Sequence, residues 1–376
     1  MSNNLYVDVH VIQTVPPSNV NRDDTGSPKS AIFGGLRRAR VSSQSWKRAT
    51  RVAFAEMLDT SDLGIRTKRA AELIAEEICR RRPDLADRAS ELGGGVLTVA
   101  GIKLAKAKQA DRQAEESGYL LFLANRQVER LADLAIRQGD GEAILKSEAR
   151  AVLSGENSID LALFGRMVAD VADLSVDAAA RVAHAISVHP VEAEYDYFTA
   201  VDEVKARSGN DEDAVAGMIG TVEFNSSTLY RYATVNVREL AASLGNDNAV
   251  QRAAAVFVEA FIRSMPTGKI NTFANSTLPD VILVRTRTDQ PVSLVGAFET
   301  PPRMIQGGGW VSAAAEALAR YCREIDGLYG DGDGVTMLTA RKDAAEAFDG
   351  LAASQSLAAT IAETRETIRS YLVAQS

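Results

Sequence analysis

Strand-like and helix-like spacings of apolar residues follow one another along this chain. In residues 5–14 aliphatic side chains recur at alternate positions, which predicts a β-strand, and runs at 228–237, 281–287 and 292–298 predict further strands. Helical spacing predicts helices at 43–58 and 249–265 and in the tail from 344. The order strand, helix, long insertion, strand, helix, strand predicts a β-α-β-β-α-β module that is interrupted after its first helix.

The segment 60–181 has a different composition. Ala, Leu, Glu and Arg recur with helical spacing at 68–82, 119–138 and 177–187, and a short run at 96–99 is strand-like. This pattern predicts a helical insertion separate from the β-containing core. Residues 13–29 are rich in Pro, Asn, Asp, Ser and Gly and predict a long loop.

The helix predicted at 43–58 has two chemically different sides, and Ser43 is its predicted N-cap. On a wheel of roughly 100° per residue, polar and basic side chains share one arc: Gln44, Lys47, Arg48 and Arg51. Apolar side chains cluster on the opposite side: Trp46, Ala49, Ala53 and Met57. We expect the apolar side to dock on the sheet and the basic side to face outward.

Charge makes this region stand out. The protein has a formal net charge of −8, yet the stretch from Thr25 to Ala55 holds seven basic residues and no acid. The rest of the chain therefore sums to −15, because the seven positive charges are removed from −8. A concentrated basic stripe on an acidic protein is typical of a local anionic partner such as a nucleic acid, although most charge runs are solvated faces.

Residues typical of catalysis are scarce. The three histidines, His10 in the first strand and His184 and His189 at a predicted helix end and its loop, lack metal-binding spacing. Cys79 and Cys322 are far apart, which fits a reducing cytoplasm. No secretory signal or membrane-spanning run is apparent, and we expect no metal, no cofactor, no membrane association and no enzymatic activity.

Several ordered stretches resemble one family. Residues 21–24, 31–35 and 37–49 (RRARVSSQSWKRA) closely resemble CasC, the backbone subunit of the type I-E CRISPR surveillance complex Cascade, in the RAMP superfamily. Further similar stretches follow in the same order at 159–167, 183–186, 196–202, 220–224 and 230–233. The resemblance spans about residues 5 to 300 and is weakest in the insertion and the tail.

The resemblance implies an α+β fold with an RRM-like (ferredoxin-like) palm, a large helical fingers insertion and a thumb hairpin. The implied boundaries are an N-terminal palm region with the basic RNA-binding loop and helix at 1–59, fingers at 60–181, a palm segment at 182–191, the thumb at 192–224, and the remainder of the palm with C-terminal helices at 225–376.

The resemblance also implies site residues. Those matching the RNA-binding motif are Arg22, Lys29, Arg38, Arg40, Ser42, Ser43, Gln44, Lys47, Arg48 and Arg51. Basic side chains attract phosphates, and hydroxyls near a helix N-terminus can donate to them. Those matching an apolar wedge that displaces bases are Met167, Phe198 and Ile219. Candidates on the fingers for contacting target DNA are Lys103, Lys106, Lys108, Arg112, Lys146 and Arg150.

The implied function is a non-catalytic CRISPR RNA-binding subunit that oligomerises along the guide RNA, forms the Cascade backbone and presents the guide to target DNA. Its implied partners are guide RNA, copies of itself, other Cascade subunits (end caps, large and small subunits) and target DNA. One alternative is a metal-independent endoribonuclease that processes guide RNA, with His10 or His184 as its base. Another is a DNA-binding regulator that places the 43–58 helix in a major groove.

Overall fold

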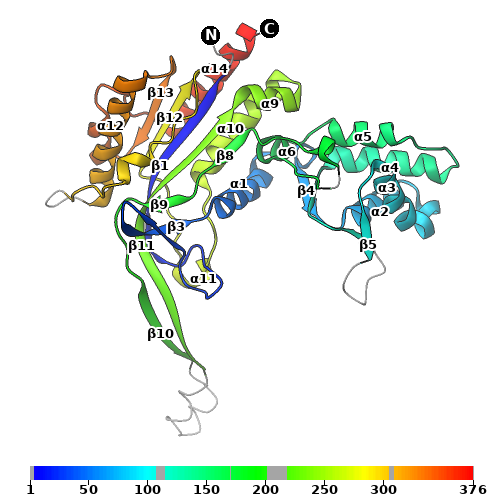
Figure 1. The fold of residues 1–376 in the computed structure, drawn as a ribbon, viewed down its shortest axis with the longest axis horizontal. Coiled ribbons are helices and arrows are strands. Elements are labelled where there is room, and N and C mark those ends of the chain that lie inside the picture. The colour runs from blue at the N-terminus through cyan, green and yellow to red at the C-terminus, as the bar shows by residue number, and fades with distance from the viewer. Residues whose placement is uncertain (1–3, 107–114, 170, 201–217, 305–308, 376) are drawn as a thin grey trace, which may run out of the picture.

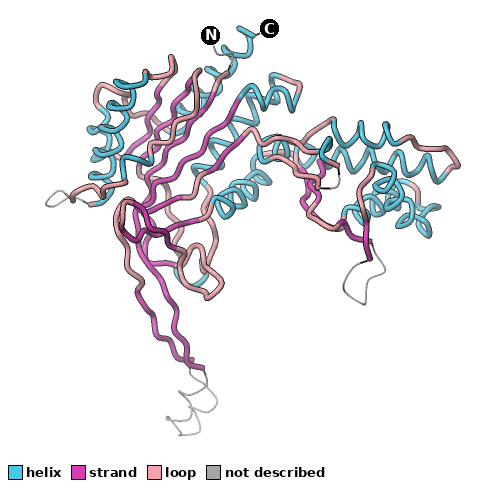
Figure 2. The backbone as a smooth tube through the Cα atoms, in the orientation of Figure 1, coloured by secondary structure: helices cyan, strands magenta, loops and turns pink. Residues whose placement is uncertain are grey.

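A computed structural model describes residues 4–106, 115–169, 171–200, 218–304 and 309–375 of the 376-residue chain. It shows an α+β protein with three regions: a body built on a sheet, a helical lobe beside it, and a long hairpin that projects from the body (Figure 1). Strands gather in the body and the hairpin, whereas helices make up most of the lobe (Figure 2). No helix within these described ranges is long and apolar enough to span a bilayer.

The body contains an antiparallel sheet in the order β13-β12-β1-β11-β9-β3-β2, with β8 also paired to β11. Its strands are β1 (Tyr6–Ser18), β2 (Ser30–Phe33), β3 (Leu36–Val41), β8 (Ala180–Val182), β9 (Ala185–Ser187), β11 (Met218–Asn236), β12 (Val281–Arg287) and β13 (Thr336–Ala340). The long central strand β1 pairs with β11 on one side and β12 on the other. Because side chains alternate across a strand, β1 supplies both faces of the sheet.

Helices cover both faces of this sheet. Val7, Val9 and Val11 of β1 point into a core formed with α1 (Ser43–Met57), α9 (Val237–Leu244), α10 (Asp247–Arg263) and α14 (Leu357–Gln375). Ile12 points to the other face of the strand and lies in a second core under α12 (Trp310–Tyr329). The body also holds the short helices α11 (Ile270–Phe273) and α13 (Lys342–Ala345) and 3-10 turns at Val295–Phe298 and Glu346–Phe348.

The helical lobe has a hydrophobic core of its own, built from side chains such as Ile74, Leu97 and Leu131. Its elements are α2 (Ala70–Arg81), α3 (Ala89–Ala100), α4 (Asn125–Gly139), α5 (Lys146–Ser154), the strand pairs β4 (Gly64–Thr67) with β7 (Leu121–Ala124) and β5 (Leu104–Lys106) with β6 (Glu115–Ser117), and 3-10 turns at Thr60–Asp62, Pro83–Arg88 and Ala172–Leu174. The helix α6 (Ile159–Phe164) lies at the junction and packs into the core of the body. All of these elements lie between residues 60 and 181, where the insertion is predicted.

The hairpin pairs β10 (Glu194–Ala200) with the beginning of β11, from Glu194 opposite Phe224 to Ala200 opposite Met218. It extends well beyond the body, pointing downward in Figure 1. The Phe198 ring covers Gly220 of the facing strand so closely that a Cβ there would lie 2.5 Å from a ring atom. Gly220 therefore lets the aromatic ring lie flat against the hairpin.

Several local predictions are wrong. Residues 177–187 form β8 and β9 rather than a helix, 96–99 belong to α3, and 292–298 contain a 3-10 turn rather than a strand. Strands of three residues are too short to show an alternation, and their pairing with β11 comes from a distant region of the chain. The N-cap of α1 is Ser42 rather than Ser43, because the Ser42 hydroxyl accepts a hydrogen bond from Ser45 N.

Replacing Trp46 should be costly, because its side chain is 1% exposed and packs edge-on against Phe261. We expect Trp46→Ala to lower the free energy of unfolding by about 3–5 kcal/mol. Val52 lies on the same helix but is 59% exposed, so Val52→Ala should change the free energy of unfolding by about 0.5 kcal/mol or less. Urea unfolding followed by circular dichroism measures both, and equal losses would contradict this packing of α1.

Candidate nucleic-acid interface

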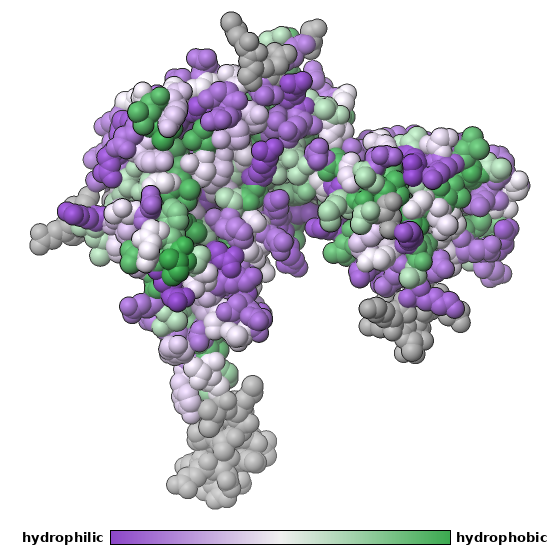
Figure 3. All heavy atoms as spheres, in the orientation of Figure 1, coloured by the Kyte–Doolittle hydropathy of each residue, from purple (hydrophilic) through white to green (hydrophobic). Residues whose placement is uncertain are grey.

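Helix α1 separates two clefts on the surface of the protein. Trp46, Thr50 and Phe54 are buried on its inner side, as the helical pattern predicts for Trp46. Arg48 and Val52 face outward and line both clefts. We call the cleft between α1 and the helical lobe the lobe-side cleft, and the one between α1 and the loops 20–26 and 265–269 the loop-side cleft. Figure 3 shows the open notch between body and lobe.

The lobe-side cleft has a volume of about 1220 Å³ and two unlike walls. The α1 wall carries polar and cationic side chains: Gln44, Lys47, Arg48 and Arg51. The facing wall carries apolar and aromatic side chains, namely Leu120, Phe122, Phe164 and Met167, together with the exposed charged residues Arg66 and Asp177. A strand of nucleic acid also has two unlike sides, because its phosphates are anionic and its bases have apolar faces.

Positive charge is concentrated at this cleft. Lys47 is half-buried, and burial followed by repulsion from Arg66 lowers the pKa of its ammonium group. Arg66 lies on β4, is exposed and lines the same cleft. Two close cations are favourable when an anion lies between them. Sequence reasoning missed Arg66 because only the fold brings β4 next to α1.

Arg51 is held by the protein itself. Its Nε donates to Asp160 Oδ2 at 3.2 Å, and its guanidinium lies 4.7 Å from the centre of the Phe122 ring. Asp160 is buried, which raises the pKa of its carboxyl, and it also accepts hydrogen bonds from Gly64 N and the Ser158 hydroxyl. The Arg51 side chain is 31% exposed. Arg51 therefore ties α1 to the base of the lobe and offers little free charge to a ligand.

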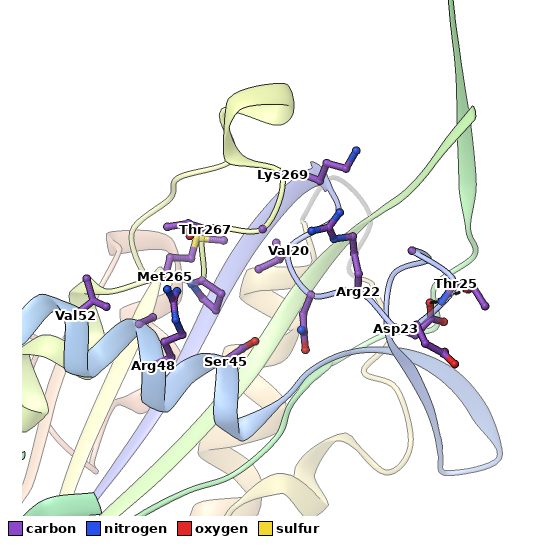
Figure 4. A pocket seen from close by; sticks show the side chains of 16 residues that line it. Val20, Arg22, Asp23, Thr25, Ser45, Arg48, Val52, Met265, Thr267 and Lys269 are labelled. Atoms are coloured by element: carbon purple, nitrogen blue, oxygen red, sulfur yellow. Dashed lines mark hydrogen bonds between the residues drawn. The ribbon is translucent and has the colours of Figure 1, made fainter. Parts of the chain in front are cut away.

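The loop-side cleft has a volume of about 980 Å³, and three cationic residues line it: Arg22, Arg48 and Lys269 (Figure 4). Asp23 also lines it, but its Oδ1 already accepts hydrogen bonds from Thr25 N, the Thr25 hydroxyl and Ser27 N. These hydrogen bonds lower the pKa of the Asp23 carboxyl, and the one from the Thr25 hydroxyl has the largest effect. Asn21 joins this loop to α1, because its Oδ1 accepts from Ser42 N at 2.9 Å.

The N-terminus of α1 is bonded to a histidine. Ser43 N and the Arg40 guanidinium both lie 3.3 Å from His184 Nδ1, and because both are donors this nitrogen is the acceptor. Burial, then the charges of Arg40 and Lys29, lowers the pKa of His184. His184 is therefore a neutral imidazole at pH 7, and its Nδ1 lone pair is already engaged. Lys29, Arg40, Ser42 and Ser43 thus lie together around this helix end.

Arg38 is separate from the other predicted residues. It is fully buried, and its guanidinium donates to the carbonyl oxygens of Ser187 and Phe298 at 3.0 Å. In β3, exposed Arg37 alternates with buried Arg38. Because the β2–β3 hairpin was not predicted, this inward orientation was missed. In this structure Arg38 is a core residue and does not belong to the exposed basic surface.

His10 is also inaccessible. It is 1% exposed in β1, and its Nδ1 lies 2.9 Å from the Tyr230 hydroxyl. Burial, with the charges of Arg285 and Arg287, lowers the pKa of His10 to about 3. A substrate cannot reach this ring without opening the sheet. Across the described residues, no group of three His, Cys, Asp or Glu side chains could hold a metal ion.

The predicted wedge residues lie on different elements. Met167 is 81% exposed and lines the lobe-side cleft, whereas Phe198 lies on the hairpin over Gly220. Ile219 is in β11 opposite Thr199, but its side chain lies outside the described residues.

The predicted finger cations are all in the lobe sequence. Lys103 and Lys106 lie before and within β5, and Lys146 begins α5. Arg150 donates to the Ala100 carbonyl oxygen at 3.1 Å, so its guanidinium also supports the fold of the lobe. The remaining two candidates, Lys108 and Arg112, lie outside the described residues.

Comparisons with known proteins agree with one another. A family model described as "CT1975-like protein" matches residues 7–364. A solved chain described as "CRISPR RNA-guided surveillance complex, pre-nicking" is 33% identical, with a TM-score of 0.85 over 96% of this chain and 100% of that one. Another, described as "CRISPR RNA-guided surveillance complex", is 30% identical, with a TM-score of 0.75 over 96% of this chain and 99% of that one. No curated protein matches the chain.

The bonding of His184 predicts its titration. Its pKa should lie below the ordinary value of 6.5, and Arg40→Ala should raise it by removing a nearby positive charge. Because the folded state disfavours the charged ring, the stability associated with His184 is complete above pH 6.5 and declines as the pH falls. Histidine NMR signals followed against pH measure this. An Arg40→Ala variant whose His184 pKa is unchanged or lower would contradict it.

Proposed function

Because the chain belongs to the CT1975-like family of Cas proteins, we propose that it is a non-catalytic subunit of the CasC kind, which binds guide RNA and builds the backbone of a type I-E Cascade complex in the cytoplasm. In this proposal copies of the chain stack along one guide RNA. Other Cascade subunits, as end caps and as large and small subunits, complete the assembly, which presents the guide to target DNA. The proposal involves no cofactor.

One observation carries the proposal: across the lobe-side cleft, the basic side of α1 faces a wall that contains apolar and aromatic side chains and a further cation, Arg66. Lys47 and Arg48 suit phosphates, whose contacts do not read sequence, so any guide can be accepted. Met167 lies on the facing wall, and apolar side chains are the type that separates stacked bases. Sequence is then read by base pairing between guide and target.

The fold supports the same proposal. The strand order β12-β1-β11-β9, with α1 after β1 and α10 after β11, is that of a β-α-β-β-α-β module, which suits an RRM-like palm. On this interpretation the lobe is the fingers and the β10–β11 hairpin is the thumb. A projecting hairpin that contacts a different surface of the next copy makes a heterologous contact, and such contacts build open filaments.

The positions of the histidines favour the non-catalytic role over the endoribonuclease. A general base needs a free lone pair within reach of the substrate. His10 is buried beneath the sheet surface, and the Nδ1 of His184 accepts from Ser43 N and lies against Arg40.

Reversing two charges on α1 should abolish RNA binding. With about four to six phosphates neutralised per copy, log K for single-stranded RNA should fall against log salt concentration with a slope of roughly −3 to −4. Lys47→Glu with Arg48→Glu should lose this affinity while the monomer stays folded. Arg51 is unsuitable for this test, because Arg51→Glu would place a carboxylate against buried Asp160. Fluorescence anisotropy at several salt concentrations measures the affinity.

A matched double reversal controls for net charge. Arg320 on α12 and Lys342 on α13 are exposed and lie on the opposite side of the sheet from α1. Arg320→Glu with Lys342→Glu changes the net charge by the same amount and should leave the affinity within about twofold, since these sites are screened from the RNA. An equal loss of RNA affinity in both double variants, or a wild-type salt slope near zero, would contradict the assignment of RNA binding to α1.

A further inference from the structure

The loop-side cleft begins where the lobe-side cleft ends. Arg48 and Val52 line both, so an RNA strand held against Arg48 from the lobe side is already at the edge of the second cleft. Its far wall is the segment 265–269, which contains no residue of the RNA-binding motif identified by resemblance. This wall therefore has no assigned role.

The cleft presents cations from three separate elements. Arg22 comes from the loop after β1, Arg48 from α1, and Lys269 from the turn before α11. In Figure 4 the Lys269 side chain lies above that of Arg22, and Arg48 lies toward the end of the cleft where Val52 is. Two acids, Asp23 and Asp24, also line the cleft, and the carboxylate of Asp23 accepts hydrogen bonds from its own loop. An extended anion could contact all three cations in turn.

Lys269 is held in place by its backbone. Gly268 lies so close to the loop before it that a Cβ would be 2.1 Å from the Val20 carbonyl oxygen. Lys269 has φ +53°, and its carbonyl oxygen accepts from Thr272 N and Phe273 N in the α11 turn. A non-glycine residue rarely adopts this left-handed conformation, which is strained for a residue with a Cβ. The packing of the turn maintains this strained conformation and so fixes the position of the Lys269 backbone, from which the side chain extends.

The cleft also leads toward the hairpin. Phe273 of α11 packs against Phe224 of β11, with ring centroids 5.8 Å apart. Asn19, which precedes the wall residue Val20, donates from its Nδ2 to the Glu223 carbonyl oxygen at 2.9 Å. Both walls of the loop-side cleft are therefore anchored at the base of the β10–β11 hairpin. A strand that crosses α1 at Arg48 would be directed toward that base.

We propose that single-stranded RNA continues from the lobe-side cleft across α1 into the loop-side cleft, and that Lys269 contacts its sugar–phosphate backbone opposite Arg22. This inference rests on the proposed function and extends its binding surface to the segment 265–269. Lys269 makes a phosphate contact, so it adds affinity equally for all RNA sequences.

The test compares Lys269→Ala with the wild-type protein on two labelled single-stranded RNAs of unrelated sequence. Removing one phosphate contact should make the salt slope less negative by about 0.7 on both RNAs. Lys269→Arg should keep the wild-type slope, because it preserves the charge. Lys342→Ala on α13 is the matched control and should also keep the wild-type salt slope. Thermal unfolding followed by circular dichroism checks that each variant is folded.

The outcomes separate this inference from the proposed function. If Lys269→Ala keeps the wild-type slope while Arg48→Ala reduces it, RNA binds at α1 and the role of Lys269 is wrong. If Lys269→Arg makes the salt slope less negative by as much as Lys269→Ala does, the effect comes from the turn and not from the charge. That result also overturns the inference. A wild-type protein with no salt-dependent RNA affinity would overturn both proposals.

Discussion

The docking of α1 on the sheet depends on a buried arginine. The Arg231 guanidinium of β11 lies 3.8 Å from the centre of the Trp46 ring and 4.6 Å from that of Phe261, between α1 and α10. Burial lowers its pKa to about 9, and Gln13 Oε1 and the Phe261 carbonyl oxygen accept its hydrogen bonds. Together with the burial of Thr50 and Phe54 on the same side of the helix, this contact sets the rotation of α1 about its axis. The outward direction of Lys47 and Arg48, and with it the two clefts, follows from that rotation.

The basic stretch has two tasks, which its charge alone does not distinguish. Arg38 and Arg51 support the fold, one by donating to buried carbonyl oxygens and the other by pairing with Asp160. Lys47 and Arg48 line the lobe-side cleft, as Arg51 does, but no ion pair within the described residues engages them. Basic residues within the same short stretch thus either support the fold or lie open in a cleft, and the difference lies in what the fold places opposite each side chain.

Sequence patterns predicted the elements whose signal is local. The two sides of α1 and the strand β12 at Val281–Arg287 follow from spacing within one segment. The strands β2, β8, β9 and β13 were missed because they are short. β8, β9 and β13 also pair with strands far away in the sequence, whereas β2 pairs with the adjacent β3. Arg66 and Lys269 were missed for a related reason: Arg66 lies on a strand of the predicted insertion and Lys269 lies far from α1 in sequence, and only the fold brings each of them to a cleft beside that helix.

The central claim is that copies of this chain bind one guide RNA at regular intervals along it. The most direct measurement is to purify the protein with its native guide-encoding array, digest the complex with ribonuclease and determine the lengths of the protected RNA. The account predicts protected fragments whose lengths differ by a constant period, because each copy covers one interval and leaves the next exposed. Protein free of RNA, or RNA cut once at a fixed site, would contradict it.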